Sequence, residues 1–191
     1  NPQLISAIEE PVQGVPPARN RGVEAASSRW IAFLDADDEW YPEKIERSIP
    51  YLDGRHVLVC HDFINRCDGV DRRISSHKRS QILPSQFASL LANNFIGTLT
   101  VIANREAILR AGGFALGYVN GEDYNLWLKL LGSRDSSAYV IGEPLATRNH
   151  RPDSISRNRL VSQLWSVRAR CSALTFILTQ RYRANGAGSR P

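Results

Sequence analysis

The stretch WIAFLDADDEW, residues Trp30–Trp40, decides the fold of this chain. It opens with the continuous apolar run WIAFL, which is typical of a β-strand buried on both faces. Three carboxylates, those of Asp35, Asp37 and Asp38, then follow within four positions. Alternate side chains of an extended backbone point the same way, so the first two carboxylates repel each other unless a positive charge lies between them. The stretch therefore predicts a buried strand that ends at a site for a divalent cation or a phosphate ligand, because carboxylate oxygens favour magnesium or manganese.

A plainer role for these acids stays open, namely a solvated turn that caps the helix beginning near Pro42. One acid at Asp38 would fit such a turn, whereas three acids directly after a buried strand favour the ligand site. Ligands of open α/β sheets bind at the C-terminal ends of the strands, and this cluster stands at such an end.

Strand and helix patterns alternate along the rest of the chain. Helices are predicted at residues 18–28, 43–52, 85–93, 105–111, 122–131 and 159–182, and strands at 57–63, 98–103, 138–141 and 145–149. Asn104 is placed to cap the helix that follows it, and Gly112-Gly113 to end that helix. Residues 65–81 are polar, basic and poor in apolar side chains, which predicts a mobile loop. The alternation of strands and helices predicts an α/β fold with a layered sheet.

Length and composition limit the class of protein. The chain has 191 residues, 42% of them hydrophobic and 23% charged, which suits a soluble globular domain. No apolar run reaches the roughly 18 residues that cross a bilayer, and no signal peptide opens the sequence. Methionine is absent, so we expect the chain to be a fragment. Cys60, Cys67 and Cys171 have no metal-ligand spacing and predict reduced thiols and a cytoplasmic protein.

The positive charge is concentrated at the C-terminus. From Arg151 onward there are eight arginines and one aspartate. The net charge of this segment therefore exceeds the net charge of +5 of the whole chain. Nucleic-acid binding is not expected, because its positive charge would spread over a folded face. The helix at 159–182 carries an apolar seam at near-heptad spacing: Leu160, Leu164, Val167, Cys171, Leu174 and Leu178. This basic helix is compatible with peripheral contact with an anionic membrane. The alternatives are a solvated helix face, or a seam that packs on the domain or on a partner.

A second acidic motif lies in GEDYNLWLKLL, residues 121–131. Glu122 and Asp123 occupy the first turn of an amphipathic helix, where the helix macrodipole stabilises negative charge. One acid here would need no other explanation. A pair that follows the flexible Gly112-Gly113 loop and precedes a tightly packed helix predicts a carboxylate held rigidly beside an adaptable pocket, as a general base requires.

Both motifs together resemble the family 2 glycosyltransferases, which have the GT-A fold. ARNRGVEAASSRWIAFLDADDEWYPEKIE, residues 18–46, is similar to the central segment of that family, and GGF followed by GEDYNLWLKL, residues 112–130, is similar to its second hallmark. The resemblance implies a mixed, mostly parallel GT-A-like sheet flanked by helices. It divides the chain into a partial GT-A domain at 1–156 and a basic amphipathic C-terminal helix and tail at 157–191.

The resemblance also implies site roles. The family's Asp-x-Asp falls on Asp35 and Asp37, which would hold a Mn²⁺ or Mg²⁺ ion against the diphosphate of a nucleotide-sugar, with His150 as a possible third ligand. A lone histidine is more often structural, so this ligand stays an open alternative. The residues expected at the donor are Arg19, Asn20, Asp35, Asp38 and Gly113. The predicted lid over the donor is the loop at 65–81.

The family's Glu-Asp pair falls on Glu122 and Asp123, and the resemblance implies that Asp123 deprotonates the acceptor hydroxyl. The expected reaction is an inverting transfer from a nucleotide-sugar to a hydroxyl of a cell-surface polysaccharide or lipid-linked glycan in a bacterium. Such a transfer needs one base, unlike the two carboxylates of a glycoside hydrolase.

Three observations keep other interpretations open. The family normally begins with a strand–helix–strand unit that binds the nucleotide, and this chain starts after it, which allows a truncated module that binds metal or acceptor but is catalytically impaired. Asn125 replaces an acid often found two positions after the catalytic aspartate. A strand ending in Asp-x-Asp also begins haloacid-dehalogenase-type phosphatases, but Glu39-Trp40 and the position of Glu122 disfavour that class.

Overall fold

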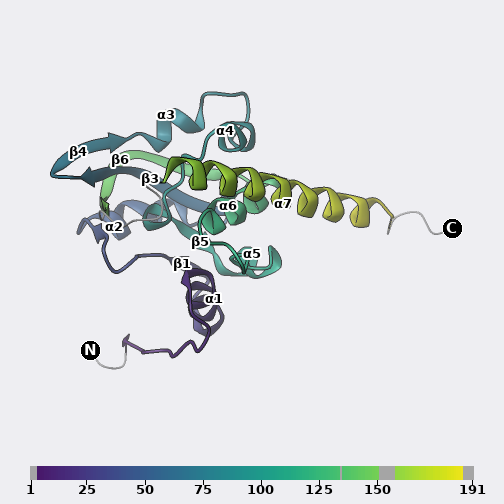
Figure 1. Cartoon of the computed structure of the whole chain (residues 1–191), viewed down its shortest axis with the longest axis horizontal. Coiled ribbons are helices and arrows are strands. Elements are labelled where there is room, and N and C mark those ends of the chain that lie inside the picture. The colour runs from purple at the N-terminus through teal and green to yellow at the C-terminus, as the bar shows by residue number, and fades with distance from the viewer. Residues whose placement is uncertain (1–3, 134, 151–157, 187–191) are drawn as a thin grey trace.

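The strand patterns of the sequence form one mixed, six-stranded sheet, seen in the computed structural model of Figure 1. The structure describes residues 4–133, 135–150 and 158–186. The strands are β1 (Trp30–Ala32), β2 (Glu39–Trp40), β3 (Leu58–Cys67), β4 (Val70–Ile74), β5 (Ile102–Asn104) and β6 (Ala138–His150). Their order is β1-β5-β3-β6-β2, and β4 pairs with β3 outside this path.

The predicted α/β class is confirmed, but the prediction of a mostly parallel sheet is wrong. Among the strands of the described residues, only β3 and β6 pair in parallel, and the other four pairings are antiparallel. The strands β1, β3 and β6 do run in one direction, as helical connections between them require. The short strands β2, β4 and β5 run the opposite way, and β5 inserts between β1 and β3. The carboxyl ends of β1 and β6 still lie at the same edge, which is where the acidic motif begins.

The helices surround this sheet (Figure 1). They are α1 (Val15–Ala25), α2 (Lys44–Ser48), α3 (Ser76–Ser80), α4 (Gln86–Ala92), α5 (Arg105–Arg110), α6 (Glu122–Gly132) and α7 (Arg159–Gly186), with 3-10 turns η2 (Ile49–Tyr51) and η3 (Thr98–Thr100). The predicted cap is confirmed, since Asn104 Oδ1 accepts a hydrogen bond from Ala107 N at 2.9 Å. Gly112 and Gly113 end α5 with φ angles of 81° and 67°, which favour glycine.

The sequence predicts that the strand before the acidic turn, β1, is buried on both faces. This prediction is wrong. The strand lies at the edge of the described sheet and pairs only with β5. The two apolar residues that follow the strand differ in burial: Phe33 is buried, whereas Leu34 is 48% exposed. The Phe33 ring packs edge-on against Phe114, with ring centroids 5.3 Å apart. An apolar run therefore marked the strand correctly but could not show its place in the sheet.

The predicted mobile loop at 65–81 is also wrong. β3 continues to Cys67, turns at Asp68-Gly69 and returns as β4, followed by α3. Both turn residues have positive φ, 50° and 76°, as a two-residue type I′ hairpin requires, and Asp-Gly is a strong signal for this turn. β4 has few apolar residues because it is exposed except at Ile74. No flexible lid can be argued from this segment.

The two short strands predicted at 138–141 and 145–149 are one long strand, β6. The sequence Gly142-Glu143-Pro144 between them looks like a turn. Instead the pairing of β6 with β3 shifts register there, and Pro144 lies opposite Asp62 at the irregularity. Proline is tolerated in a sheet at such a bulge, because no ladder hydrogen bond is required of it.

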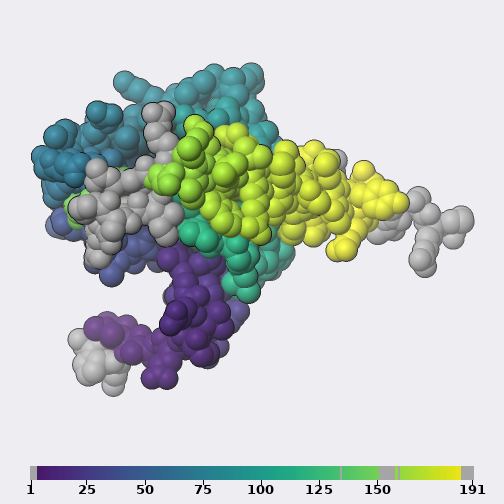
Figure 2. Space-filling view, in the orientation of Figure 1, coloured from purple at the N-terminus to yellow at the C-terminus, as the bar shows by residue number. Residues whose placement is uncertain are grey.

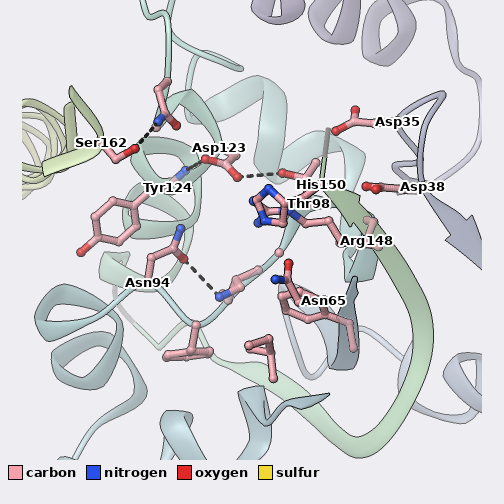
Figure 3. Close-up of a pocket in the computed structure, with 18 of the residues that line it drawn as sticks. Asp35, Asp38, Asn65, Asn94, Thr98, Asp123, Tyr124, Arg148, His150 and Ser162 are labelled. Atoms are coloured by element: carbon pink, nitrogen blue, oxygen red, sulfur yellow. Dashed lines mark hydrogen bonds between the residues drawn. The ribbon is translucent and has the colours of Figure 1, made fainter. Parts of the chain in front are cut away.

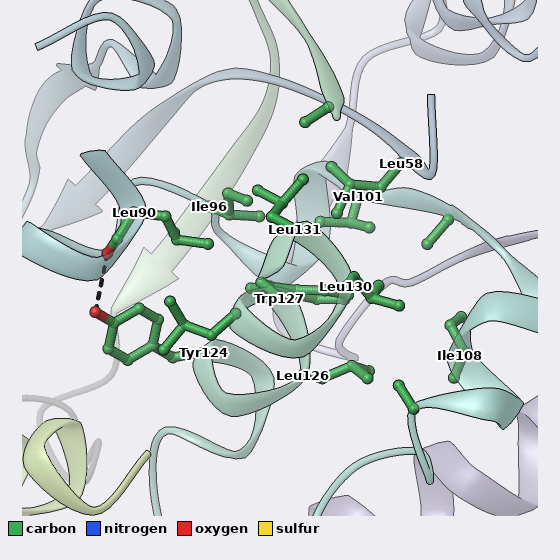
Figure 4. Close-up of a cluster of buried hydrophobic side chains, with 14 of the residues drawn as sticks. Leu58, Leu90, Ile96, Val101, Ile108, Tyr124, Leu126, Trp127, Leu130 and Leu131 are labelled. Atoms are coloured by element: carbon green, nitrogen blue, oxygen red, sulfur yellow. Dashed lines mark hydrogen bonds between the residues drawn. The ribbon is translucent and has the colours of Figure 1, made fainter. Parts of the chain in front are cut away.

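The core centres on α6 (Figure 4). Every residue of this helix except Asp123 is buried. Trp127 is fully buried, and its ring lies 6.0 Å from Phe114 and 6.1 Å from Phe33, centroid to centroid. Tyr124 OH donates to the carbonyl oxygens of Leu90 and Leu91 in α4. The first turn of α6, with its two acids, therefore belongs to a helix that the core holds on nearly all sides.

A buried lysine anchors the turn η3, which stands where the sequence predicts the start of a strand. Lys44 has no exposed surface, and its Nζ donates to Thr100 O and to His61 Nε2, both at 3.2 Å. His61 Nδ1 lies 2.6 Å from Asp62 O, so it carries the proton and Nε2 accepts. Trp40 Nε1 donates to Leu99 O at 2.8 Å, in the same turn. Burial lowers the pKa of Lys44 to about 7 and that of His61 to about 3.

Lys44 makes stability depend on pH. Its pKa is about 7 in the folded chain, against 10.5 for a lysine open to water, as in the unfolded chain. Between these values the unfolded chain binds more protons at this site, so the free energy of unfolding rises with pH, by on the order of 3 kcal/mol. Lys44→Met should lose this rise when urea unfolding is measured from about pH 7 to about pH 10. The exposed Lys78→Met is the control and should keep it, and equal pH profiles for all three proteins would contradict the assignment.

Helix α7 packs on α6 through small side chains. Ala169, Ala173 and Ile177 face the domain and are 0%, 1% and 6% exposed. An added Cβ at Gly132 of α6 would collide with Ile177, so the close approach needs glycine there. The C-terminal part of α7 extends beyond the domain (Figures 1 and 2). Within the described residues, no helix is both long enough and apolar enough to span a membrane.

The predicted seam of α7 lies on the opposite face. Leu160, Leu164 and Leu178 are 74%, 72% and 63% exposed, so the alternative that the seam packs on the domain is wrong. The arginines also differ from expectation. Arg168 lies over the rings of Tyr118 and Trp165, and Arg170 Nε donates to Tyr124 OH, so both hold the helix on the domain. Arg157 lies outside the described residues.

Candidate active site

The two acidic motifs face one pocket of about 540 Å³. It lies beyond the carboxyl ends of β1 and β6 and is closed on its other side by the starts of α6 and α7. Figure 3 shows Asp123 near its centre, with Asp35 and Asp38 on one side and Ser162 and Asn94 on the other. Its volume falls in the range of about 300–1,000 Å³ typical of small-molecule sites.

Arg19 on α1 joins the two motifs. Its Nη2 donates to both carboxylate oxygens of Asp35, at 2.7 and 2.8 Å, and its Nη1 donates to Glu122 Oε1 at 2.8 Å. Burial alone would lower the pKa of Arg19, but the charges of Asp35, Asp123 and Glu122 raise it. Burial, and then the neighbouring charge of Asp123, raise the pKa of Glu122. The Arg19 side chain therefore fixes the distance between the motifs and offsets their repulsion.

The carboxylate of Asp123 is oriented by two hydrogen bonds. Oδ2 accepts from Thr98 Oγ1 at 2.8 Å, and Oδ1 accepts from the backbone N–H of Tyr124 at 2.6 Å. Thr98 belongs to η3, the turn that Lys44 and Trp40 anchor. Asp123 is the half-buried exception in the otherwise buried α6, so its carboxylate is rigidly held yet open to the pocket.

The acidic turn after β1 is tied to the end of β6. Asp38 N donates to Asp35 O at 3.1 Å, which closes the turn. Asn149 donates from its backbone N–H to Asp38 Oδ1 at 3.1 Å, and from Nδ2 to Asp37 O at 2.8 Å. Burial raises the pKa of Asp38 to about 6, against the lowering effect of the Asn149 hydrogen bond. The position of all three acids is thus set by Arg19 and Asn149.

A cage of three protein ligands does not fit this site. In the part of the chain that the structure describes, no group of three His, Cys, Asp or Glu side chains is arranged to hold a metal ion. Both oxygens of Asp35 accept from Arg19, and His150 Nε2 lies 2.8 Å from Arg148 Nη2 and accepts from it. The hard oxygens of Asp37 and of the 42% exposed Asp35 side chain do suit a Mg²⁺ or Mn²⁺ ion bound through one or two carboxylates plus phosphates.

Two residues expected at the donor lie behind the pocket wall. Asn20 pairs with the backbone of Phe114, accepting from its N–H at 2.8 Å and donating to its carbonyl at 2.9 Å. Gly113 leaves room for this pairing, because an added Cβ would meet Asn20 Oδ1 at 2.5 Å. Neither lines the pocket. A donor role for this pair stays a prediction.

Sequence reasoning missed Thr98, Arg148 and Asn149 as site residues. The sequence predicts a strand at Thr98, and nothing in its neighbours predicts that a short turn would aim its hydroxyl at Asp123. Arg148 and Asn149 stand directly before His150, which was a candidate site residue. Their place next to it in the sequence was the signal that could have identified them.

In this α/β fold, Arg19 joins an acidic turn after a strand to an acid pair at the start of a helix. Comparison with known proteins identifies the class of enzyme that has this fold and site. The chain matches the Glycosyl transferase family 2 over residues 2–114 and belongs to that family. It is similar to the UDP-Glc:alpha-D-GlcNAc-diphosphoundecaprenol beta-1,3-glucosyltransferase WfgD of Escherichia coli, at 31% identity over 83% of this chain and 61% of that protein.

A second relative is the putative teichuronic acid biosynthesis glycosyltransferase TuaG of Bacillus subtilis, at 28% identity over 86% of this chain and 64% of that protein. An uncharacterized glycosyltransferase of Haemophilus influenzae is 30% identical over 70% of this chain and 46% of that protein. The chain thus spans less than two thirds of the length of these relatives. The family match ends before Glu122 and Asp123, so the place of the second motif in the site rests on the structure.

Proposed function

We propose that this chain is the part of an inverting glycosyltransferase that carries the general base, and that it transfers a sugar from a nucleotide-sugar to a hydroxyl of a bacterial cell-surface glycan. The observation that supports this most is the Arg19 bridge, which holds Asp35 and Glu122 at one pocket beside Asp123. The names of the E. coli and B. subtilis relatives support the glycan class, and by analogy a lipid-linked acceptor.

Asp123 acts as the base. Its carboxylate accepts the proton of the acceptor hydroxyl while that oxygen bonds to the anomeric carbon of the donor sugar. The bond from that carbon to the nucleoside diphosphate breaks on the opposite face, so the configuration inverts and a second catalytic carboxylate is not required. Thr98 and the Tyr124 N–H keep the carboxylate aimed at the acceptor. Glu122, bound to Arg19, holds the two motifs at their separation.

A divalent cation, when bound, supplies positive charge to the departing diphosphate. Asp37, together with Asp35, would hold it. Arg148 and His150 also line the pocket, and Arg148 adds a positive charge to it. Asp38 keeps the turn in place through Asn149.

Calorimetry separates this function from the alternative of a catalytically impaired binding module. We expect UDP, GDP or dTDP to bind the chain in the presence of Mn²⁺, and Asp37→Ala to weaken that binding by about tenfold or more, since even outer partners of a metal are worth about 10–100-fold. Glu46→Ala, an exposed acid outside the pocket, is the control. Failure of all three nucleotides to bind would support the impaired module.

We further propose that the exposed face of α7 rests on an anionic membrane, which would place the enzyme peripherally at the inner face. Residues 159–186 include five arginines and no acid. Arg168 and Arg170 contact the domain, but the helix as a whole is still basic, so pairing two copies through it would bring like charges together, whereas anionic lipid complements them. Leu160, Leu164, Val167 and Leu178 would enter the lipid boundary.

Vesicle sedimentation tests the membrane contact. The chain should sediment with vesicles that contain phosphatidylglycerol and far less with phosphatidylcholine alone. Leu164→Glu with Leu178→Glu should abolish sedimentation, because charged groups are excluded from the lipid boundary. Glu substitutions at the exposed Leu109 and Leu116, away from α7, are the control. If the variant with both α7 changes still sediments with the vesicles, this face does not bind the membrane. If the unmodified chain forms a concentration-dependent dimer without vesicles, self-association through this face is favoured instead.

A further inference from the structure

The pocket has two chemically different ends, with Asp123 between them (Figure 3). One end carries the charged groups of the acidic turn and of β6, including Asp35, Asp38 and Arg148. The other end carries four neutral polar side chains: Asn94, Asn120, Ser162 and Ser166. The lining of the pocket also includes Arg79 of α3. The proposed donor, with its diphosphate and cation, belongs at the charged end, which leaves the neutral end without an assigned ligand.

The neutral end offers hydrogen-bonding groups that the described residues leave unused. Asn94 Oδ1 accepts from Ile96 N at 3.1 Å, but its Nδ2 donates to no described residue. Asn120 Nδ2 donates to Ser162 Oγ at 3.0 Å, but its Oδ1 accepts from none of the described residues. The Ser166 hydroxyl has no hydrogen bond to the described part of the chain either. These groups include both donors and acceptors, and none is ionisable.

This combination selects a sugar over a phosphate. A sugar hydroxyl donates and accepts at once, so it matches an amide N–H₂, an amide oxygen and a hydroxyl together. A phosphate group would need a cation or several N–H donors, and these four side chains provide no positive charge. Neutral polar groups at a pocket of this size therefore favour an uncharged polyhydroxyl ligand.

The wall of this end is rigid because α7 is anchored to α6. Asn125 is fully buried, and its Nδ2 donates to Ala169 O of α7 at 3.0 Å. Gly121 has a φ of 80° and lies beneath the backbone of Trp165, which fixes the turn that carries Asn120 against α7. Ser162 and Ser166 stand one turn apart on the same helix, so both face the pocket. Asn125, which replaces a more usual acid of the family, thus sets the position of this wall.

We propose that Asn94, Asn120, Ser162 and Ser166 form the subsite for the acceptor sugar, and that they present one of its hydroxyl groups to Asp123. The proposal rests on the proposed function, since it assigns the pocket end that the donor does not use. It names the acceptor unit as a neutral sugar residue and makes the inner face of α7 the element that recognises it. The outer face of the same helix is the one directed to the membrane.

Saturation-transfer NMR with simple sugars tests the subsite without requiring turnover. The probes are the methyl glycosides of glucose, galactose and N-acetylglucosamine. The variants are Ser166→Val and Asn120→Ala, and the matched control is Thr175→Val, which places the same new side chain on the exposed face of α7. Each pocket variant should weaken binding of the preferred glycoside by about tenfold, as expected for one lost hydrogen bond, and the control should not. Equal melting temperatures of the variants show that the fold is kept.

Binding of UDP with Mn²⁺, measured on the same proteins, separates the two proposals. The expected result is that every variant binds the nucleotide like the unmodified chain while the glycoside is lost. If no glycoside binds the unmodified chain, or if the pocket variants bind it as well as the control does, the subsite assignment is overturned. If glycoside binding follows the prediction but no nucleotide binds, the subsite stands and the proposed transfer fails.

Discussion

Replacing Asp123 by Asn should reduce sugar transfer by about 10²–10⁴-fold and leave donor binding unchanged. The amide keeps the shape of the side chain and can still accept from Thr98 Oγ1, but it cannot take a proton from the acceptor. The loss should therefore fall in kcat and not in the KM for the donor. The measurement is steady-state transfer with each nucleotide-sugar that binds in calorimetry.

Thr98 provides the second arm of this experiment. Thr98→Val removes the hydroxyl that donates to Asp123 Oδ2 and preserves the branched shape. This hydroxyl holds the carboxylate in its orientation toward the acceptor, so the variant should lower kcat and leave the KM for the donor unchanged. Thr98→Ser should restore most of the activity. Full transfer by Asp123→Asn would remove this aspartate from the role of base.

Replacing Arg19 by Met should cost both stability and donor binding. The change leaves the Glu122 carboxylate buried without its partner, and breaking a buried ion pair from one side costs about 3–5 kcal/mol. It also frees Asp35, whose position at the donor end depends on the bidentate contact. Urea unfolding at neutral pH measures the first effect, and calorimetry with UDP and Mn²⁺ measures the second.

A double variant separates these effects. Arg19→Met with Glu122→Gln removes both partners of the buried pair, so much of the lost stability should return, while donor binding should stay impaired because Asp35 remains unheld. Arg19→Lys keeps the charge but not the planar fork and should lie between the two. If Arg19→Met has the same urea midpoint of unfolding as the unmodified chain, the Arg19 bridge contributes little to stability.

Local patterns predicted much of the fold. The cap at Asn104 and the glycine stop after α5 depend on nearest neighbours, and both are confirmed. Features that depend on distant partners were missed. The insertion of β5 between β1 and β3, which makes the sheet mostly antiparallel, has no signal in any one strand. The hairpin at Asp68-Gly69 did have a signal, but the polar, exposed β4 obscured it.

The candidate site shows the same division. The acids were found because clustered carboxylates are costly and therefore conspicuous in a sequence. The partner that relieves the cost, Arg19, was expected at the nucleotide, and its bridge from Asp35 to Glu122 required the fold to be seen. The outward direction of the α7 seam likewise depends on Ala169 and Ala173, whose small size allows close packing on α6 but is weak as a sequence signal.

The stereochemistry of the product tests the account most directly. Proton NMR of the disaccharide formed from an α-linked UDP-sugar and the preferred methyl glycoside reports the configuration at the new anomeric carbon. A single base at Asp123 acting on the face opposite the diphosphate predicts a β-linked product. An α-linked product would show retention, which one base in this position does not explain, and it would contradict the proposed mechanism.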